Sequence, residues 1–336
     1  MTRSQRKDEH VRLAYQQNTE VNHAFDELDI LYNSVADVQS DAIDLNVSFL
    51  GKTTTAIYIN AMTGGSEMTS DINRDLAIVA RECGLMMAVG SQSAALDDSD
   101  LAGSFKVVRD VNPQGIVLAN VGAENSLKRA HEAVRMLDAD ALQVHVNRPQ
   151  ELVMSEGERD FSHWSSSLKS LVESIEVPVI VKEVGFGMSY QTLSHLLALG
   201  VHAVDISGKG GTNFIAIEKQ RGSSRLPEGL DNFGLTAVES LLQSSSLQSQ
   251  MTVLASGGIK TAMDCVKCFV LGARAVGLSS WFLVRLMNEG VERTIEMTQE
   301  LLRDIRFILA LYGVESVSQA SRLDYVISER LKQYYR

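Results

Sequence analysis

The chain has 336 residues, of which 45% are hydrophobic and 22% are charged, so it can bury one large core or two ordinary ones. Its formal net charge of -11 argues against nucleic acid and membrane surfaces as partners, because both are polyanionic. The first residues are charged and polar, unlike a secretory signal, and no run of about 18 apolar residues predicts a membrane span. We therefore expect a cytoplasmic protein.

Residues 1–49 form a polar, carboxylate-rich lead-in with short amphipathic pieces, such as residues 25–32. From residue 56 onward the pattern changes to short apolar runs that end in glycine or polar residues, each followed by a helical stretch. These runs predict eight strands. They are residues 56–61, 85–89, 116–119, 141–146, 177–181, 203–206, 252–255 and 275–278.

Continuous apolar strands that alternate with helices predict an α/β protein whose parallel sheet is covered on both faces. Eight units at a spacing of roughly 28 residues favour a (β/α)8 TIM barrel over an open doubly wound sheet, which normally has fewer strands. The sequence contains no clear linker, so we expect a single domain. Its parts are expected to be an N-terminal arm (residues 1–55), a barrel core (56–290) and a C-terminal helical extension (291–336).

Three segments outside the strands also predict local structure. Asn125 is expected to cap a helix over residues 126–137, whose apolar side chains recur at three- and four-residue steps. Residues 213–232 are long for a strand-to-helix loop and favour either a lid or binding loop or disorder. Residues 292–312 have a long helical pattern.

Two of the three cysteines, Cys265 and Cys268, form a C-x-x-C pair inside a predicted helix. No second pair of cysteines or histidines lies nearby in the sequence to complete a zinc site. We expect both to be reduced.

The ends of the first seven predicted strands carry residues suited to a polar ligand, and in a parallel barrel these ends meet at one face. Glycines in such turns let backbone N–H groups approach an anion. A phosphate is expected near the last two strands, at residues 256–260 and 278–280. The seven stretches are residues 62–65, 90–93, 120–122, 145–151, 182–185, 205–212 and 256–260.

The stretch 145–151, His-Val-Asn-Arg-Pro-Gln-Glu, is the densest of these in chemical groups. It offers an imidazole, two carboxamides, a guanidinium and a carboxylate directly after an apolar strand, and Pro149 ends that strand. Taken alone, it also fits an ordinary polar loop with a satisfied histidine. Its place among six other polar strand ends favours a site.

Lys182 ends an otherwise apolar strand and would carry its charge into the mouth of the barrel. In a flavin enzyme, a cation near the N1 and O2 edge stabilises the anionic reduced ring. The alternative is an internal ion pair with Glu183 or another carboxylate, because buried charges are normally paired.

Together these stretches resemble a known family, the type 2, FMN-dependent isopentenyl-diphosphate delta-isomerases. The resemblance covers nearly the whole chain, and several well-separated motifs occur in the family's order. They are Arg-Lys-Asp-Glu-His at 6–10, Met-Thr-Gly-Gly at 62–65, Val-Gly-Ser-Gln at 89–92, the stretch 145–151, Val-Lys-Glu-Val-Gly at 181–185, residues 205–212 and Ser-Gly-Gly at 256–258.

The resemblance implies three sets of binding residues. The FMN contacts would come from Met62, Thr63, Gly64, Ser91, Asn120, Lys182, Ser207 and Thr212, with the FMN phosphate around Gly258, Lys260 and Ser279. The isoprenoid diphosphate would meet Arg6, Lys7, Ser91, Gln92, Ser93, His145 and Gln150. Glu151 would hold Mg2+. NADPH as the reductant and a homo-oligomer, either a tetramer or an octamer, are also implied.

One departure from the family is visible. Lys260 stands where the family has an arginine, so a two-pronged phosphate contact would become a point-charge contact. This change puts the strength of FMN retention in doubt but not the fold.

The implied reaction, from isopentenyl to dimethylallyl diphosphate, adds one proton and removes another without net oxidation. An alkene is a poor base, so the reaction needs a well-placed acid and an electron-rich face, which reduced FMN could supply. Gln150 has no pKa near neutrality and is expected to do hydrogen-bonding or proton-relay work. His145 either transfers a proton or only orients the diphosphate.

Two alternatives belong to other classes. An FMN-dependent 2-hydroxy-acid oxidase or dehydrogenase would need a base, usually a histidine in the loop after the sixth strand, but residues 207–211 read Ser-Gly-Lys-Gly-Gly. An inactive flavin-binding scaffold would have no use for Gln150 and Glu151. The sequence therefore favours the isomerase.

Overall fold

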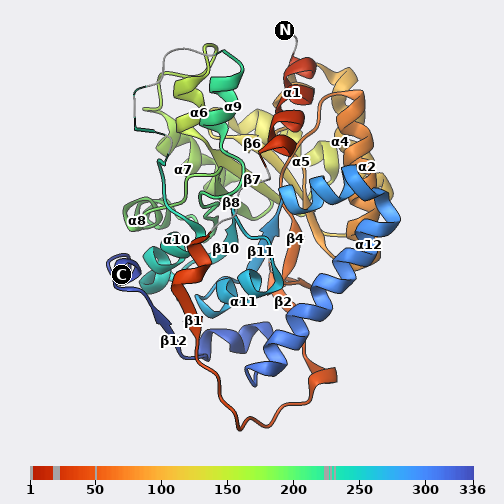
Figure 1. Cartoon of the computed structure of the whole chain (residues 1–336). Coiled ribbons are helices and arrows are strands. Elements are labelled where there is room, and N and C mark those ends of the chain that lie inside the picture. The colour runs from red at the N-terminus through yellow and green to blue at the C-terminus, as the bar shows by residue number, and fades with distance from the viewer. Residues whose placement is uncertain (1–2, 18–22, 50, 223–226, 228, 231) are drawn as a thin grey trace.

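The computed structural model describes residues 3–17, 23–49, 51–222, 227, 229, 230 and 232–336 (Figure 1). Eight parallel strands close into a barrel and follow one another around it in chain order. They are β4 (Ile57–Ile59), β5 (Met86–Ala88), β6 (Val117–Gly122), β7 (Ala141–Val146), β8 (Val179–Glu183), β9 (Ala203–Asp205), β10 (Thr252–Ser256) and β11 (Ala275–Leu278). Each of the eight apolar runs overlaps one strand, and the predicted barrel is confirmed.

The strands are apolar on both faces because both faces are covered. Side chains that point inward, such as Tyr58, Met86 and Leu118, form a core inside the barrel. Side chains on the outward face, such as Ile57 and Ile59, pack against the surrounding helices. This two-sided burial explains the continuous apolar runs in the sequence.

A ring of helices covers the outside of the barrel. They are α2 (Glu67–Cys83), α4 (Gly103–Val111), α5 (Leu127–Leu137), α7 (Trp164–Ser174), α8 (Tyr190–Ala198), α10 (Ala237–Ser244), α11 (Ala262–Val270) and α12 (Ser280–Leu311). Capping boxes at Ser66, Thr236 and Thr261 begin α2, α10 and α11, and satisfy backbone N–H groups that the first turn leaves free.

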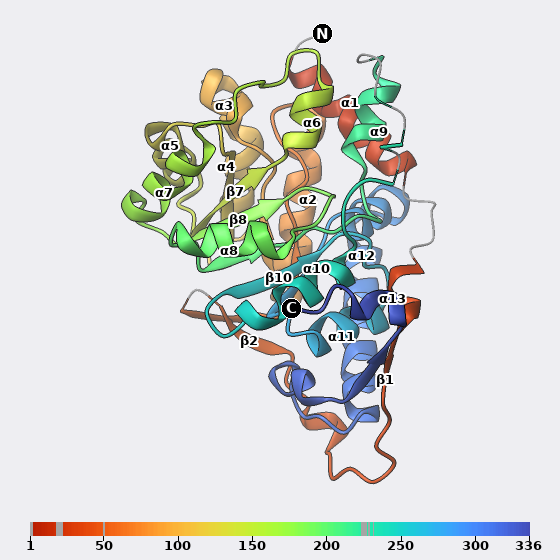
Figure 2. The same cartoon turned by 90° about the vertical axis from the view of Figure 1, so that its left-hand side faces the viewer.

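Shorter elements decorate the barrel. The short helices are α3 (Ser93–Asp97), α6 (Arg148–Val153), α9 (Phe214–Gln220) and α13 (Glu329–Lys332). Segments of 3-10 helix cover His23–Glu27, Ser40–Ala42, Ser99–Ala102, Ser245–Leu247 and Val317–Arg322. Figure 2 shows α6 and α9 on the same side of the molecule as α1 (Arg3–Gln16), at the top.

The predicted N-terminal arm divides between the two ends of the barrel (Figure 1). Helix α1 lies at the top, whereas the hairpin of β2 (Asn46–Phe49) and β3 (Lys52–Thr55) lies lower and sends Phe49 into the inner core. Strand β1 (Leu28–Ile30) pairs with β12 (Tyr325–Ile327), so the arm and the C-terminal extension are joined. The amphipathic piece at 25–32 consists of the end of a 3-10 helix followed by strand β1.

The start of α5 corrects one prediction. Ser126, not Asn125, is the N-cap, because Ser126 has the extended backbone conformation and its side chain accepts from the backbone N–H of Arg129. Asn125 instead donates to the carbonyl of Gly122 at 3.2 Å.

Two longer segments also differ in detail from their predictions. The loop at 213–232 contains α9, and six of its later positions lie outside the described residues. The helix predicted at 292–312 is the second half of α12, whose backbone departs from helical geometry at Gly290 (φ 77°, ψ -177°).

Cys265 and Cys268 are buried in α11, as expected, and burial raises the pKa of both thiols. No helix in the described ranges combines the length and the apolar character that crossing a membrane requires.

Candidate active site

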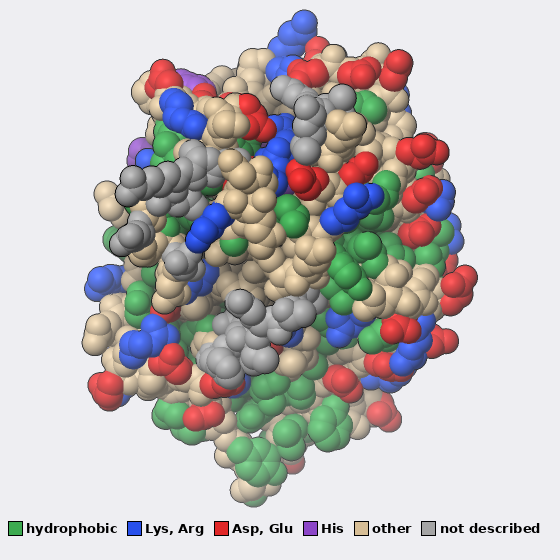
Figure 3. All heavy atoms as spheres, turned by 45° about the horizontal axis from the view of Figure 1, so that its top comes forward, with side chains coloured by type: hydrophobic (Ala, Val, Ile, Leu, Met, Phe, Trp, Pro, Cys, Tyr) green, Lys and Arg blue, Asp and Glu red, His purple; other side chains and the backbone are tan. Residues whose placement is uncertain are grey.

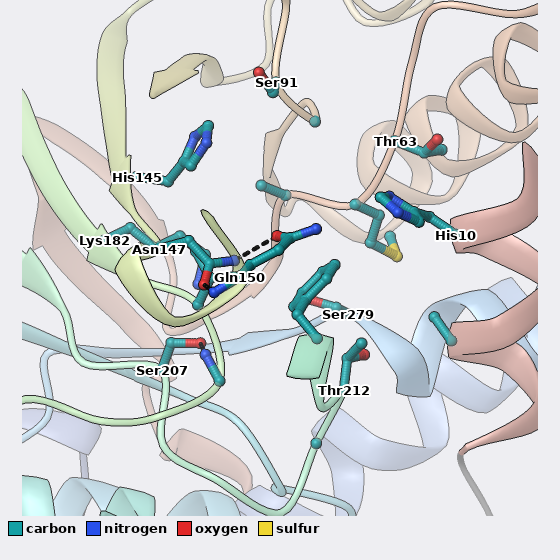
Figure 4. Close-up of a pocket in the computed structure, with 18 of the residues that line it drawn as sticks. His10, Thr63, Ser91, His145, Asn147, Gln150, Lys182, Ser207, Thr212 and Ser279 are labelled. Atoms are coloured by element: carbon teal, nitrogen blue, oxygen red, sulfur yellow. Dashed lines mark hydrogen bonds between the residues drawn. The ribbon is translucent and has the colours of Figure 1, made fainter. Parts of the chain in front are cut away.

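A cavity of about 1260 Å³ opens at the carboxyl ends of the strands (Figure 4). Its walls come from the strand ends, from α1 and from the α6 and α9 regions, which converge on one space. Pockets for single small ligands usually measure roughly 300 to 1,000 Å³, so this cavity has room for a cofactor and a substrate together.

Most of the predicted site residues line this cavity. They are Arg6, Lys7, Met62, Thr63, Ser91, Ser93, Asn120, His145, Gln150, Glu151, Lys182, Ser207, Thr212, Gly258 and Ser279. The structure brings these positions together from segments far apart in the sequence.

Gln92 and Gly64, two further predicted site residues, are not among the residues that line the cavity and have structural contacts nearby. Gln92 is fully buried; its Nε2 donates to the carbonyl of Ala133 at 3.0 Å and its Oε1 accepts from the N–H of Asn120 at 2.9 Å. At Gly64, with φ 153°, the ring of Phe105 occupies the space that a Cβ would need.

Lys260 lies beside the main cavity rather than in its wall. It borders a small recess together with Gly211, Thr212 and Ser280. All three of these neighbours also line the main cavity, so Lys260 is next to the predicted phosphate seat.

The seat predicted for FMN offers groups that fit that cofactor. The Thr63 hydroxyl is buried and has no hydrogen-bond partner within the described ranges. Such an orphan group indicates a missing partner, because buried polar atoms are nearly always bonded. Gly257 and Gly258 both have positive φ, and a Cβ on Gly257 would clash with the backbone of Gly208. These turns keep the backbone close and accessible, as a phosphate requires.

Lys182 is held by a carboxylate on the neighbouring strand. Its Nζ is 2.9 Å from Oδ2 of Asp205, whose side chain is fully buried. Asp205 also accepts from the Tyr58 hydroxyl at 2.8 Å, from Asn60 Nδ2 at 2.7 Å and from Ser256 Oγ at 2.6 Å. The predicted internal ion pair is therefore present, and Lys182 still faces the cavity.

Glu183, the other partner considered for Lys182, binds backbone instead. Its Oε2 accepts from the N–H groups of Phe186 at 2.6 Å and Gly187 at 3.1 Å. Burial raises the pKa of Glu183 to about 8 against the effect of these bonds.

A chain of amides orients His145. Asn60 donates to Asp205 and accepts from Gln143, and Gln143 accepts from Asn120 Nδ2 at 3.1 Å. Asn120 Oδ1 then faces His145 Nδ1 at 2.8 Å, so Nδ1 must carry the proton and Nε2 is an acceptor. Burial lowers the pKa of His145 to about 4, and the charges of Lys7 and Lys182 contribute, so the ring is neutral at pH 7.

Gln150 lies at the centre of the labelled groups in Figure 4. Its Oε1 accepts from Asn147 Nδ2 at 2.6 Å, and its Nε2 donates to Glu218 Oε1 at 3.0 Å. Asn147 is also the N-cap of α6 and accepts from the N–H of Gln150. The orientation of the Gln150 carboxamide is thereby defined.

Glu218 is a site residue that the sequence did not reveal. It lies in α9 with a fully buried side chain, and Arg221 and His10 bond to the same carboxylate. Burial raises the pKa of Glu218, but the hydrogen bonds from His10 and Gln150 outweigh it and hold the pKa below its usual value. The available signal was a glutamate directly after the apolar run Phe214 to Ile217.

Ion pairs tie the elements around the mouth to one another. Arg6 Nη1 is 2.8 Å from Glu156 Oε1, and Arg221 bonds Glu9 at 2.9 Å. Figure 3, in which the top of the molecule comes forward, shows lysine and arginine side chains interspersed with acidic ones. The positive charge is local, as the net charge of -11 requires of an enzyme that binds an anion.

Glu151 faces the cavity and has one oxygen engaged, because its Oε2 accepts from the N–H of Glu158 at 2.7 Å. Within the described ranges no three His, Cys, Asp or Glu side chains form a metal-binding group. A cation at Glu151 would therefore take further oxygen ligands from a bound substrate or water.

Comparison with known proteins decides the family. A model of the FMN-dependent dehydrogenase family matches residues 100–326. Isopentenyl-diphosphate delta-isomerase from Staphylococcus saprophyticus is 47% identical over 333 residues, which cover 99% of this chain and 96% of that protein. The chain belongs to the FMN-dependent isopentenyl-diphosphate delta-isomerases. The protein of that name from Staphylococcus aureus agrees, at 42% identity over 98% of this chain and 95% of its own length.

Solved structures of mandelate oxidase share the fold of this isomerase family member. One, with benzaldehyde, superposes with a TM-score of 0.67 at 17% identity and covers 95% of this chain and 91% of its own. A second, with an FMN monooxide adduct, has a TM-score of 0.66 at 16% identity, with 94% and 92% covered. In the loop where an oxidase needs its base, Lys209 Nζ bonds Asn232 Oδ1 at 3.0 Å.

Proposed function

We propose that this family member interconverts isopentenyl and dimethylallyl diphosphate with Gln150 and Glu218 as the proton-handling residues. The observation that carries the proposal is the 3.0 Å bond between the amide of Gln150, which lines the cavity, and the buried Glu218 carboxylate behind it. A proton shuttle needs such a pair, whereas oxidation of a hydroxy acid needs a histidine base that the loop after β9 lacks.

Gln150 can pass a proton without a pKa of its own near neutrality. Its Oε1 can receive a proton while its Nε2 gives one to Glu218, so that the amide is restored when the steps reverse. Glu218 is ionised in the free site, because its hydrogen bonds lower its pKa, and is therefore ready to receive that proton. When bound, reduced FMN would supply an acidic N5 and an electron-rich ring against the cationic transition state.

The same residues that line the cavity divide into an FMN set and a diphosphate set. Lys182 is suited to the N1 and O2 edge of the flavin, since Asp205 fixes its position. The remaining FMN contacts would be Met62, Thr63, Ser91, Asn120, Ser207 and Thr212, with the phosphate at Gly258, Ser279 and Lys260.

The diphosphate would lie between α1 and His145. Lys7 is close enough to His145 and to His10 to influence both pKa values, so its charge is near the centre of the site. Arg6 and Ser93 complete this set, and Arg6 would exchange its partner Glu156 for the diphosphate. His145 would meet the diphosphate through Nε2, the nitrogen that Asn120 leaves available, after Nε2 has taken up a proton.

Glu151 would hold Mg2+ together with diphosphate oxygens, because a hard cation prefers charged oxygen ligands. We expect Glu151→Gln to weaken magnesium-dependent diphosphate binding and to leave FMN binding intact. Unchanged magnesium dependence would remove this assignment. NADPH as the reductant and a homo-oligomeric state belong to the same proposal and follow from the family resemblance. A cytoplasmic location is proposed from the polar first residues and the lack of a long apolar run in the sequence.

The central test is Glu218→Gln, which keeps the shape of the side chain but cannot receive a proton. Its kcat should fall by about 10²- to 10⁴-fold, the usual worth of a general acid or base, while FMN binding is retained. Glu156→Gln is the matched control, since Glu156 is a nearby glutamate that lines the cavity but bonds Arg6 rather than Gln150. Wild-type kcat in Glu218→Gln would overturn the proposed role of the pair.

A further inference from the structure

The Glu218 carboxylate is connected to the edge of the site by His10. Nε2 of His10 is 3.1 Å from Glu218 Oε1, the same oxygen that accepts from Gln150 Nε2 at 3.0 Å. The Glu218 side chain is fully buried, whereas 17% of the His10 side chain is exposed. One carboxylate oxygen therefore bridges the central amide and a partly exposed histidine.

The protonation states fix the direction of the His10 bond. Burial lowers the pKa of His10, and Lys7 and Arg221 add to this effect while Glu218 opposes it. The imidazole is therefore neutral at pH 7, and the ionised Glu218 can only accept hydrogen bonds. The ring proton must then lie on Nε2, pointing at the carboxylate.

Among the described residues, His10, Gln150 and Arg221 bond Glu218, and of these His10 is the one that can exchange protons with solvent near neutral pH. The Gln150 carboxamide has no pKa in that range, and the pKa of the Arg221 guanidinium is raised further from it. An imidazole has two nitrogens, so it can take a proton at one and give a proton from the other.

We propose that His10 is the solvent-side end of a proton relay that runs from Gln150 through Glu218, an inference that rests on the proposed function. In the inward direction a solvent proton binds Nδ1, the Nε2–H bond breaks, and that proton joins Glu218 Oε1. The carboxylate becomes a carboxylic acid, and the imidazole stays neutral as its other tautomer. The outward direction reverses these changes. His10 thus acts through Glu218 and not on the substrate.

The relay predicts that the transferred proton exchanges with solvent, which turnover alone does not require. Isomerisation adds one proton and removes one, so it needs no net proton from solvent, but exchange of the relayed proton needs a path out of the site. In D2O the wild-type product should carry deuterium at the carbon that is protonated. His10→Gln keeps a donor for Glu218 but has no pair of ring nitrogens, so it should incorporate severalfold less deuterium per product molecule.

Tyr15→Phe is the matched control, because it weakens the attachment of α1 to the barrel without changing His10. The Tyr15 hydroxyl donates to Asn288 Oδ1 at 2.6 Å, which anchors α1 to α12 away from Glu218. This variant should keep wild-type labelling. His10→Ala provides a second test, because added imidazole can fill the space of the lost ring and should restore deuterium labelling.

Mass spectrometry of the first product formed distinguishes the outcomes. Wild-type labelling in His10→Gln, an equal loss in Tyr15→Phe, or a folded His10→Ala that does not respond to imidazole would each overturn the relay. A wild-type protein that forms no dimethylallyl diphosphate would instead overturn the proposed function.

Discussion

Lys182 and Asp205 form a buried ion pair, with 6% and 0% of their side chains exposed. Lys182→Met would leave the Asp205 carboxylate buried without its cation, which typically costs about 3 to 5 kcal/mol. We expect the free energy of unfolding, measured in urea, to fall by that amount and FMN affinity to fall with it.

The double variant Lys182→Met, Asp205→Asn is the control, because it removes the stranded charge. It should recover most of the lost stability but not the FMN affinity. Unchanged stability in the single variant would show that the pair does not hold the site together.

His145 makes a pH-dependent contribution whose sign follows from its pKa. The folded-state pKa is about 4, below the ordinary value of 6.5. Between these two pH values the imidazole is protonated in the unfolded chain but neutral in the folded chain. This stabilising contribution is complete above pH 6.5 and is lost as the pH falls toward 4. Bound diphosphate should raise the pKa, because its negative charge favours the imidazolium.

Proton uptake on binding tests this account of His145. Calorimetry at pH 6 in buffers of different ionisation enthalpy should show that wild type takes up more protons on binding the diphosphate than His145→Gln does. Equal uptake in the two proteins would mean that His145 does not sense the diphosphate.

The residues that sequence reasoning found and missed differ in where they lie. Gln150 and His145 follow strand β7, and barrel topology brings strand ends together, so their place was predictable. Glu218 lies in α9 and His10 in α1, and neither residue stands at the end of a barrel strand. The hydrogen bond between these two side chains joins residues that are 208 positions apart in the sequence. It depends on side-chain packing, which the periodicity of the sequence does not encode.

At the scale of elements, the long helix α12 contains a defined break at Gly290. Its φ of 77° and ψ of -177° are strained for any residue with a Cβ, although the space around it is open. Gly290→Ala should therefore lower stability by about 1 to 3 kcal/mol through backbone strain alone.

Gly103 is the matched control for that change. It begins α4 with helical φ and ψ and also has open space around it. Thermal unfolding of both variants is the measurement, and Gly103→Ala should be neutral or slightly stabilising. Equal effects of the two substitutions would contradict the strain at Gly290.

Helix α1 is expected to serve the substrate more than the fold. The Arg6–Glu156 pair is partly exposed, at 22% and 45%, so its loss should cost less than about 1 kcal/mol. Arg6→Ala should raise KM for the diphosphate, whereas Glu156→Gln should lower it by releasing Arg6. A large fall in melting temperature in Arg6→Ala would mark α1 as structural instead.

The sequence predicted the barrel strands well, but not the cap of α5 or the break in α12. The apolar runs located every barrel strand, because burial on both faces leaves a continuous signal. Asn125 and Ser126 are both good caps, and only backbone conformation distinguished them. The break at Gly290 was not predicted, because a single glycine is compatible with a helix at modest cost.

For the whole molecule, the two ends of the barrel have different tasks. The end with Phe49 and the β2–β3 hairpin is closed by packing, whereas the other end carries the cavity. The sequence predicted the barrel, but it did not predict that residues 1–55 would contribute α1 to one end of the barrel and the β2–β3 hairpin to the other. That division depends on long-range contacts, such as the pairing of β1 with β12.

The central claim is that the site moves protons with a reduced flavin that is not consumed. Under anaerobic conditions, a single chemical reduction of bound FMN should support many turnovers of isopentenyl diphosphate, followed by NMR, with no further NAD(P)H spent. Consumption of one reductant per product, or full activity with oxidised FMN, would contradict the account.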